Sequence, residues 1–487
     1  MTATWTKPGA TEAFPWLPAS STDSGRERAE SFSSEREEDL QIRAAALAQQ
    51  AFGDWPERRV DRLLQGLAEV IVEHARDLAR RTVLETGMGC EDDKAAKNTC
   101  AALGVLSSMQ AQTACGVLRW DTHSGITEMA VPVGVVLGMM PVTNPVATTV
   151  FSALIALKAG NALLVRAHPR AAEVTAMTVA LMRTALAARG APADLVQALQ
   201  PVDRAQVRRL FRHRGVDLVL ATGSTGLVAE AMSSGKPTLG AGTGNAPAWI
   251  CDDADVQSAA QSIVDSKSFD HGIICGSEQH LIVSVGILPR VVAALERAGA
   301  AVLSPADVTQ LEMALFKDGR PRPELMGRSP GVLVGQAALH CRSDARVLVA
   351  PVSDTPASPW RVGRLAPVLA LRAVPDEADA LALCRQILAG EGAGHTAAIH
   401  TRSRAKALSF ARSVPTSRVI VNGPASQGCI GLGNAMTPSF TLACGAAGGS
   451  TTTDNITFRH LTQVIRLAEP RAPAAGPRSM PSTGEAR

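Results

Sequence analysis

The chain has 487 residues, of which 46% are apolar and 19% are charged, and its formal net charge is +3. This length exceeds what one simple core holds, so we expect two or three domains, and the composition is that of an ordinary globular protein. The small net charge argues against a nucleic-acid partner.

The first residues are rich in Ser, Thr, Pro, Glu and Arg, and we expect residues 1–36 to form a flexible arm. They show no basic region followed by an apolar run, so we predict no signal peptide. A helix is predicted over 37–51. Pro56 then opens a long amphipathic helix that ends before Gly87, and another helix is predicted over 94–113.

Short apolar strands and helices alternate from about residue 133 onward. Strands are predicted over 133–140, 162–167 and 216–222, and helices over 148–158, 171–189 and 225–234. A second alternating run begins near residue 247 and includes strands over 366–374, 397–400 and 418–422. This rhythm is typical of parallel sheets covered by helices on both faces, so we predict two α/β domains in series.

The distribution of charged residues and cysteines indicates where in the cell the protein is located. Residues 129–157 carry no charge, but three prolines and Asn144 interrupt them, which favours a buried strand, turn and helix over a membrane span. The nine cysteines include no CxxC pair and no cysteine–histidine cluster with zinc-ligand spacing. We therefore expect no metal site, no disulfide framework, no membrane partner and a cytoplasmic location.

The segment SKSFDHGIICGSEQ (residues 266–279) is the most informative part of the chain. Cys275 follows an apolar pair and is flanked by Gly272 and Gly276, small residues that let a substrate and the backbone approach closely. An ordinary thiol has a pKa of about 8.5, so a nucleophilic cysteine needs help from its surroundings at neutral pH. By itself, a cysteine in apolar surroundings is more often a core residue.

Residues 266–279 resemble the catalytic segment of the coenzyme A (CoA)-acylating branch of the aldehyde dehydrogenase family. Four further stretches resemble family segments in the same order, namely residues 139–171, 221–250, 392–400 and 421–449. The resemblance covers roughly residues 37–465. It implies an aldehyde dehydrogenase-like α/β fold with a Rossmann-type cofactor domain, an α/β catalytic domain and a small oligomerisation element.

The resemblance also implies where these parts begin and end. It gives a flexible N-terminal arm over 1–36, a cofactor-binding domain over 37–250, a catalytic domain over 251–422, a C-terminal active-site and oligomerisation segment over 423–465, and a flexible tail over 466–487. Residues at about 117–131 lie where the family has an oligomerising hairpin, so we expect a homodimer or a homotetramer.

The mechanism that the resemblance implies begins with Cys275, which attacks an aldehyde. Asn144 matches the family's side-chain donor to the resulting oxyanion, although an asparagine before Pro145 is by itself more typical of a turn. His395 matches a histidine typical of the acylating branch, which orients CoA or assists its thiol, and a merely structural histidine is the alternative. Hydrolytic family members carry a glutamate in a Glu-Leu-Gly-Gly-Lys motif, whereas the matching residues 239–245 (LGAGTGN) have no carboxylate. We therefore predict that CoA, and not water, takes the acyl group, with a hydrolytic aldehyde or semialdehyde dehydrogenase as the alternative.

The implied cofactor is NAD or NADP. No GxGxxG motif follows a predicted strand, but TGSTG (residues 222–226) follows one and precedes a helix, so its N–H groups can face a pyrophosphate. Taken alone, such a Gly-Ser-Thr run often just caps a helix. The cofactor-binding positions implied by the resemblance are Thr143, His168, Pro169, Gly223, Ser224 and Gly242.

The sequence departs from the family pattern at two positions. Gly363 stands where acylating relatives often have a glutamate that holds the nicotinamide ribose. His271 stands where they often have asparagine, and we interpret it as a candidate donor to an anionic substrate, so that sulfoacetaldehyde or a semialdehyde competes with acetaldehyde. A reductase of acyl phosphates and a non-enzymatic protein on the same fold are the remaining rival interpretations.

Overall fold

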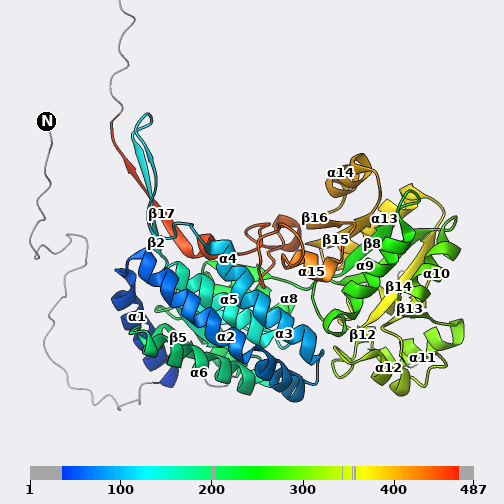
Figure 1. Cartoon of the computed structure of the whole chain (residues 1–487), viewed down its shortest axis with the longest axis horizontal. Helices are drawn as coiled ribbons and strands as arrows, with labels where there is room; N and C mark the ends of the chain where they lie inside the picture. The colour runs from blue at the N-terminus through cyan, green and yellow to red at the C-terminus, as the bar shows by residue number, and fades with distance from the viewer. Residues whose placement is uncertain (1–35, 200–202, 343, 354, 356–357, 471–487) are drawn as a thin grey trace, which may run out of the picture.

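The computed structural model describes residues 36–470, apart from 200–202, 343, 354 and 356–357. The expected N-terminal arm lies outside the described residues except for Arg36, as does the chain beyond residue 470. The described chain forms two α/β bodies, which lie side by side along the long axis, and a narrow hairpin projects from the first body (Figure 1).

The first body is built on a five-stranded parallel sheet with strand order β5-β4-β3-β6-β7. Its strands are β3 (Val135–Met139), β4 (Ala162–Arg166), β5 (Val196–Ala198), β6 (Leu218–Thr222) and β7 (Thr238–Ala241). Its helices are α1 (Glu37–Gly53), α2 (Glu57–Thr86), α3 (Glu91–Thr99), α4 (Val105–Met109), α5 (Pro145–Lys158), α6 (Ala172–Ala188), α7 (Arg204–Arg212) and α8 (Thr225–Met232). Every residue of α5 is buried, so the charge-free stretch that contains this helix forms part of the core.

The second body is built on a seven-stranded parallel sheet with strand order β10-β13-β14-β9-β8-β15-β16. Its strands are β8 (Ala246–Ile250), β9 (Glu278–Ser284), β10 (Ala300–Val302), β13 (Val347–Pro351), β14 (Val368–Val374), β15 (Gly394–His400) and β16 (Thr416–Val421), with a separate pair of short strands, β11 (Phe316–Lys317) and β12 (Arg320–Pro321). Its helices are α9 (Val256–Ser268), α10 (Leu288–Arg297), α11 (Pro305–Leu315), α12 (Pro330–Gln336), α13 (Glu377–Gly390), α14 (Arg404–Ser413) and α15 (Ala425–Cys429).

Both faces of the second sheet are covered. Ala248 and Ile250 of β8 pack in one apolar cluster with α9 and α10, whereas Trp249 between them packs in another cluster with α13 and α14. Alternate residues of a strand point to opposite faces, so the two clusters are the two sides of the sheet. This burial explains why the strands read as nearly continuous apolar runs in the sequence.

The hairpin is part of a third sheet. It consists of β1 (Gly116–Asp121) and β2 (Ile126–Pro132), and β17 (Thr462–Ala468) pairs with β2 in the antiparallel order β1-β2-β17 (Figure 1). Large apolar side chains are exposed on this sheet, including Trp120 at 74% and Leu467 at 58% exposure. Exposed apolar surface of this kind marks a place where proteins associate.

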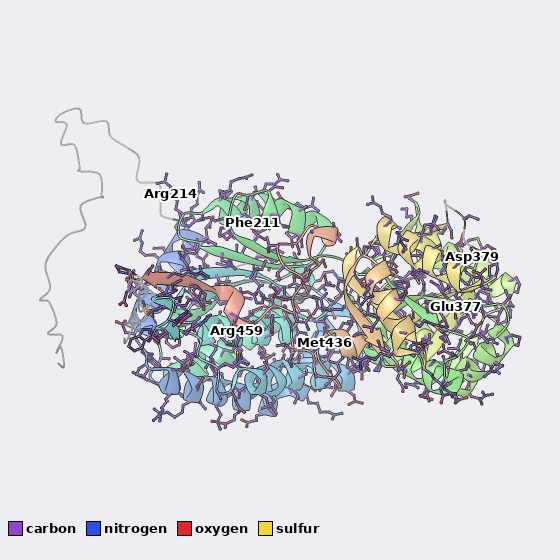
Figure 2. The ribbon with its side chains drawn as sticks, turned by 90° about the horizontal axis from the view of Figure 1, so that it is seen from above. Phe211, Arg214, Glu377, Asp379, Met436 and Arg459 are labelled. Carbon is purple, nitrogen blue, oxygen red and sulfur yellow. The ribbon has the colours of Figure 1, made fainter. Side chains whose placement is uncertain are left out.

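The segment between β16 and β17 returns from the second body to the first. Figure 2 shows Met436 of this segment at the junction of the two bodies and Arg459 in the first body, whereas Glu377 and Asp379 lie far out in the second. The junction is therefore built from three parts of the chain, namely the two bodies and this returning segment.

The structure differs from the sequence expectations at three boundaries. β8 belongs to the second sheet, so the second body begins at Ala246, near the start expected for the second alternating run (about residue 247) and before the domain boundary expected after residue 250. β17 continues through Ala468 into the expected tail (466–487), because pairing with β2 orders it. The helix expected over 94–113 ends at Met109 and contains a π-helical segment, Cys100–Gly104.

One helical stretch, Pro169–Ala188, is long and apolar enough to cross a membrane by length and composition alone. Here it packs against α2 and α5, and Val174, Val179 and Leu186 are buried in the first body. A core helix satisfies the same compositional test as a membrane span, and this helix takes the role of a core helix in the fold.

Candidate active site

The six expected cofactor positions follow the carboxyl ends of four neighbouring strands. They are Thr143 after β3, His168 and Pro169 after β4, Gly223 and Ser224 after β6, and Gly242 after β7. Because these strands are parallel, all six positions lie along one edge of the first sheet. The strand order reverses between β3 and β6, and such a switch point is where open α/β sheets bind ligands.

The start of α8 lies at this edge. Ser224 is its N-cap residue, and the Ser224 Oγ accepts a 3.4 Å hydrogen bond from the Leu227 N–H. Gly242 faces open space, since no atom lies within 4 Å of the place where its Cβ would be. The helix N-terminus and the space beside it are suited to an anionic pyrophosphate.

His168 begins a short turn after β4. Its Nδ1 accepts a 3.1 Å hydrogen bond from the Arg170 N–H. Burial lowers the pKa of His168, and Arg166 and Arg170 lower it further, so its ring is neutral at pH 7. The edge therefore presents a neutral ring at this position.

Cys275 lies in the turn between α9 and β9, at the junction of the two bodies. It is half-buried and packs against the core of the first body. The backbone of Gly244, just after β7, approaches so closely that a Cβ at residue 244 would lie 1.9 Å from the Cys275 carbonyl oxygen. The cofactor edge and the candidate nucleophile are therefore in direct contact.

The thiol of Cys275 is protonated at rest. Burial raises the pKa of Cys275 to about 11, Cys444 adds to this rise, and Arg418 acts against it. At pH 7 only about one thiol in ten thousand is then ionised. Formation of the nucleophile requires that the proton leave as substrate binds.

Asn144 is the N-cap residue of α5 but makes no capping hydrogen bond. Its Oδ1 instead accepts a hydrogen bond from the Lys97 Nζ, and its Nδ2 makes only a long 3.4 Å contact with the Thr143 Oγ1. Since the oxygen of the amide is held by a cation, the NH₂ group is the end left to donate to a substrate. This is the orientation that an oxyanion donor requires.

A buried ion cluster joins this loop to the nucleophile loop. The Lys97 Nζ also bonds the Asp270 Oδ2, and the Lys94 Nζ bonds both the Asp270 Oδ2 at 3.1 Å and the Thr143 carbonyl oxygen at 3.0 Å. Burial acts to raise the pKa of Asp270, but the two lysines outweigh it and the pKa lies below its ordinary value. Burial lowers the pKa of Lys94 to about 8.

The backbone around Asp270 is unusual. Asp270 and His271 have φ values of 47° and 53°, a left-handed conformation that residues other than glycine rarely adopt. The Asp270 carboxylate holds this turn in place, because its Oδ1 accepts a 2.9 Å hydrogen bond from the Cys90 N–H and its Oδ2 receives the two lysines. Such strain is retained where the surroundings fix it, and here it lies just before Cys275.

His395 is fully buried in β15, beside the contact between Gly244 and Cys275. The Cβ position of Gly244 lies 3.2 Å from the ring, and the His395 Nδ1 lies 2.9 Å from the Thr396 Oγ1. Burial lowers the pKa of His395 to about 3, and Arg418 adds to the effect. The ring is therefore neutral, and its Nε2 has no hydrogen-bond partner among the described residues.

Arg418 of β16 fixes the surroundings of His395. It donates to the His395 carbonyl oxygen at 3.0 Å, to the Asn455 Oδ1 at 2.6 Å and to the Ala443 carbonyl oxygen at 2.6 Å. These bonds tie the returning segment to the second sheet. Arg418 is itself buried, with 3% exposure, so its charge acts on the site through little solvent.

The side chains of Glu278 and Gln279, which follow the nucleophile loop, are held by hydrogen bonds. The buried Glu278 accepts hydrogen bonds from the Ser266 Oγ at 2.5 Å and from the Ala425 N–H at 2.9 Å. The Gln279 Oε1 accepts a 3.1 Å hydrogen bond from the Arg364 N–H. Both side chains brace the loop that carries Cys275.

The two departures from the family pattern have distinct surroundings. The His271 Nδ1 lies 3.1 Å from the Gly327 carbonyl oxygen, so one of its two ring nitrogens is engaged with the backbone. At Gly363 a Cβ would lie 2.7 Å from the Gly244 carbonyl oxygen, too close for any side chain. The Gly363 N–H donates to the Glu391 Oε2 at 2.8 Å, which brings a carboxylate to this place from another segment.

Several residues at the site were not found from the sequence, chiefly Lys94, Lys97, Asp270, Glu391 and Arg418. The two lysines lie one helical turn apart in a helix whose other residues are mostly polar, so they look like a solvated face. A buried lysine pair has no local signature. The one signal in the sequence is Asp270 itself, because an acidic residue in a largely apolar segment needs a charged or hydrogen-bonding partner when it is buried.

The family model of the aldehyde dehydrogenase family matches residues 25–310. The chain belongs to the aldehyde dehydrogenase family. A sulfoacetaldehyde dehydrogenase (acylating) of Cupriavidus necator is 33% identical over 441 residues, covering 88% of this chain and 88% of that protein. The chain spans about half the length of several other curated relatives that it matches, between 46% and 51%.

Solved structures of aldehyde dehydrogenases share the fold. An acetylating aldehyde dehydrogenase from Geobacillus thermoglucosidasius has a TM-score of 0.87 and 35% identity, covering 91% of this chain and 97% of that chain. A propionaldehyde dehydrogenase from Rhodopseudomonas palustris, solved with bound CoA and an acylated cysteine, has a TM-score of 0.81 and 27% identity, covering 88% of this chain and 96% of that chain.

Proposed function

We propose that this chain is a CoA-acylating aldehyde dehydrogenase. It oxidises a short-chain aldehyde with NAD⁺ or NADP⁺ and transfers the acyl group through a thioester on Cys275 to CoA. The observation that carries this proposal is the contact between the Cys275 loop and the cofactor edge at Gly244. The names of the Cupriavidus necator and Geobacillus thermoglucosidasius relatives contain the words "acylating" and "acetylating", which supports CoA as the acceptor of the acyl group.

The first body binds the cofactor in this proposal. Gly223 and Ser224 at the start of α8 would hold the pyrophosphate of the cofactor, and Gly242 leaves space beside them. Thr143, His168 and Pro169 complete the edge on the other side of the switch point. The bound nicotinamide supplies a hydride acceptor, and the second body supplies the nucleophile.

The first chemical step is addition of the Cys275 sulfur to the aldehyde carbon. The carbon–sulfur bond forms as the carbonyl π bond breaks, the thiol proton passes to solvent water, and the carbonyl oxygen becomes an oxyanion. The Asn144 Nδ2 and the Cys275 backbone N–H donate to that oxygen, and one such donor is typically worth about 3–4 kcal/mol of barrier. Loss of hydride from the same carbon leaves a thioester on Cys275.

The second step transfers the acyl group. The CoA sulfur attacks the thioester and the bond to the Cys275 sulfur breaks. The proton of the incoming thiol passes to the departing Cys275 sulfur, whose pKa of about 11 makes it the stronger base. The neutral His395, whose Nε2 has no partner among the described residues, orients the incoming thiol. Water is the competing nucleophile, but residues 239–245 offer no carboxylate to activate it, and Glu278 already accepts two hydrogen bonds elsewhere.

The test follows NADH or NADPH formation from short aldehydes with and without CoA, and identifies acyl-CoA and free acid by mass spectrometry. We expect acyl-CoA as the main product and loss of activity in Cys275→Ala. Cys341→Ala, which changes a partly exposed cysteine of the second body, serves as the matched control and keeps wild-type activity. Equal rates of free-acid formation without CoA would favour the hydrolytic alternative instead.

For the substrate we propose acetaldehyde or sulfoacetaldehyde. The sulfoacetaldehyde relative supports an anionic substrate, with His271 as the residue to examine. Turnover of acetaldehyde, sulfoacetaldehyde and succinate semialdehyde is compared in the wild type and in His271→Asn. A selective loss with the two anionic substrates supports the proposal, and an equal effect on all three rejects the role of His271.

We also propose a homodimer or homotetramer that assembles through the sheet of β1, β2 and β17. The exposed side chains of Trp120, Ile465 and Leu467 support this, because apolar surface of this kind is stabilised by covering it. A cytoplasmic location is supported by the nine cysteines, which all lie within the described residues and form no disulfide. Sedimentation of the wild type and of Trp120→Glu tests the assembly.

A further inference from the structure

Position 363 lacks a side chain, yet a carboxylate is present beside it. The Glu391 Oε2 accepts a 2.8 Å hydrogen bond from the Gly363 N–H and lies 3.9 Å from the place where a Cβ of residue 363 would be. That Cβ would collide with the Gly244 carbonyl oxygen, so the backbone here excludes a side chain from Gly363 itself. The carboxylate enters from the loop between α13 and β15 instead.

The packing of that loop directs Glu391 toward the cofactor edge. Glu391 is the first residue after α13, and the next residue, Gly392, has a φ of +86°. A Cβ on Gly392 would lie 2.6 Å from the Asn245 backbone nitrogen, so the loop lies directly against the segment that follows β7. Only a glycine allows this approach, and it fixes where the preceding side chain emerges.

Glu391 is linked by hydrogen bonds to the start of α8. The Thr243 Oγ1 donates to the Glu391 Oε1 at 3.3 Å and lies 2.9 Å from the Thr225 Oγ1, and Thr225 is the first residue of α8. On its other side Thr243 adjoins Gly244, which touches the Cys275 carbonyl oxygen. The carboxylate therefore lies between the proposed pyrophosphate position and the nucleophile.

We propose that Glu391 binds the hydroxyl groups of the ribose next to the nicotinamide. This inference rests on the proposed function: a dinucleotide with its phosphates at α8 and its nicotinamide at Cys275 must pass this ribose through the space beside Thr243. A ribose presents two adjacent hydroxyl donors, and a carboxylate has about four acceptor positions. The Gly363 N–H and the Thr243 hydroxyl occupy one position on each Glu391 oxygen, which leaves one on each for the ribose.

The test measures binding and does not depend on turnover. Quenching or enhancement of NADH or NADPH fluorescence gives the dissociation constant for the wild type, Glu391→Gln and Glu391→Ala, and the same titrations with competitors give it for ADP-ribose and for ADP. ADP-ribose contains the second ribose, whereas ADP lacks it. Where the wild type prefers NADPH, the fragments carrying a 2′-phosphate replace these two. Glu377→Gln is the matched control, because Glu377 begins the same helix α13 but lies far out in the second body (Figure 2).

We expect the Glu391 variants to bind the reduced cofactor and ADP-ribose about 10- to 100-fold more weakly, as expected for loss of hydrogen bonds to a charged acceptor, and to bind ADP as the wild type does. Glu377→Gln changes neither. Unchanged cofactor affinity in both variants overturns the proposal, and so does a parallel loss of ADP affinity, which indicates only a disturbed loop. A fall in free-acid release with unchanged cofactor affinity overturns it as well, because Glu391 then acts on water. A wild type that binds neither reduced cofactor refutes the proposed function itself.

Discussion

Lys97 holds the Asn144 amide by its oxygen, which leaves the NH₂ group to donate to the proposed oxyanion, so replacing Lys97 by methionine should lower the rate of catalysis more than substrate or cofactor binding. Lys97→Met keeps the length and the burial of the side chain but removes the donor to the Asn144 Oδ1. Asp270 retains Lys94 at 3.1 Å, so no carboxylate is left buried without a cation. The loop stays in place, but the amide is free to rotate.

The magnitude follows from the two bonds involved. A hydrogen bond to a charged group contributes about 1.5–3 kcal/mol, and the whole oxyanion donor about 3–4 kcal/mol. Losing the orientation of Asn144 while keeping its side chain should therefore lower kcat by roughly 10- to 100-fold. The affinity for the reduced cofactor and the alkylation rate of Cys275 should stay within about threefold of the wild type, since neither uses the Asn144 amide.

Lys158→Met is a matched control for this experiment. The side chains of Lys97 and Lys158 are 2% and 1% exposed, and both bond carboxylates, which for Lys158 are those of Glu57 at 3.0 Å and Asp61 at 2.7 Å. Lys158 ends α5, whereas Asn144 stands at its start. Lys158→Met should lose stability yet keep kcat within about threefold. A kcat for Lys97→Met close to that of the wild type, or an equal loss in both variants, would refute the argument.

The remaining predictions concern the thiol, the histidine and the contact between the two loops. Burial raises the pKa of Cys275 to about 11, so the rate of its alkylation by iodoacetamide should rise about tenfold per pH unit from pH 7 to 10. Mass spectrometry measures this rate, and a plateau near pH 8 would contradict the prediction. The His395→Ala variant should still form NADH or NADPH in a rapid initial burst, but the steady-state rate of cofactor reduction with CoA should fall at least about tenfold. Loss of the burst would place His395 in the first step instead. Gly244→Ala should abolish activity, since its Cβ would lie 1.9 Å from the Cys275 carbonyl oxygen. Gly335→Ala in α12, with open space around its Cβ, should retain activity. An active Gly244→Ala would refute the close contact.

Local patterns in the sequence predicted the parts of the fold that local forces determine. The periodicity of apolar residues located the strands β3, β4, β6 and β14 and the long helix α2, because burial on both faces or on one stripe leaves a repeating signal. The candidate cofactor residues were implied by the family resemblance, and all but Gly242 follow a predicted strand, so a parallel sheet brings them to one edge.

Long-range pairings could not be predicted in this way. Lys97 and Asp270 are 173 residues apart, and Thr243 and Glu391 are 148 residues apart, so nothing near any of them in the sequence indicates its partner. The same holds for β8, whose apolar residues fit a strand in either sheet until its neighbours β9 and β15 are known. The missing side chain at Gly363 was visible in the sequence, but its replacement by Glu391 was visible only in three dimensions.

The pairing of β17 with β2 has a consequence for how the protein is made. β2 leaves the ribosome more than three hundred residues before β17. Glu128 of β2 and Arg466 of β17, which are hydrogen-bonded, are 338 residues apart in the sequence. Until residue 468 emerges, β2 has an unpaired edge, and the segment that clamps Arg418 is not yet anchored to the first body. Nascent chains of this protein therefore carry an unpaired strand edge until β17 emerges, and such an edge is a site of mispairing.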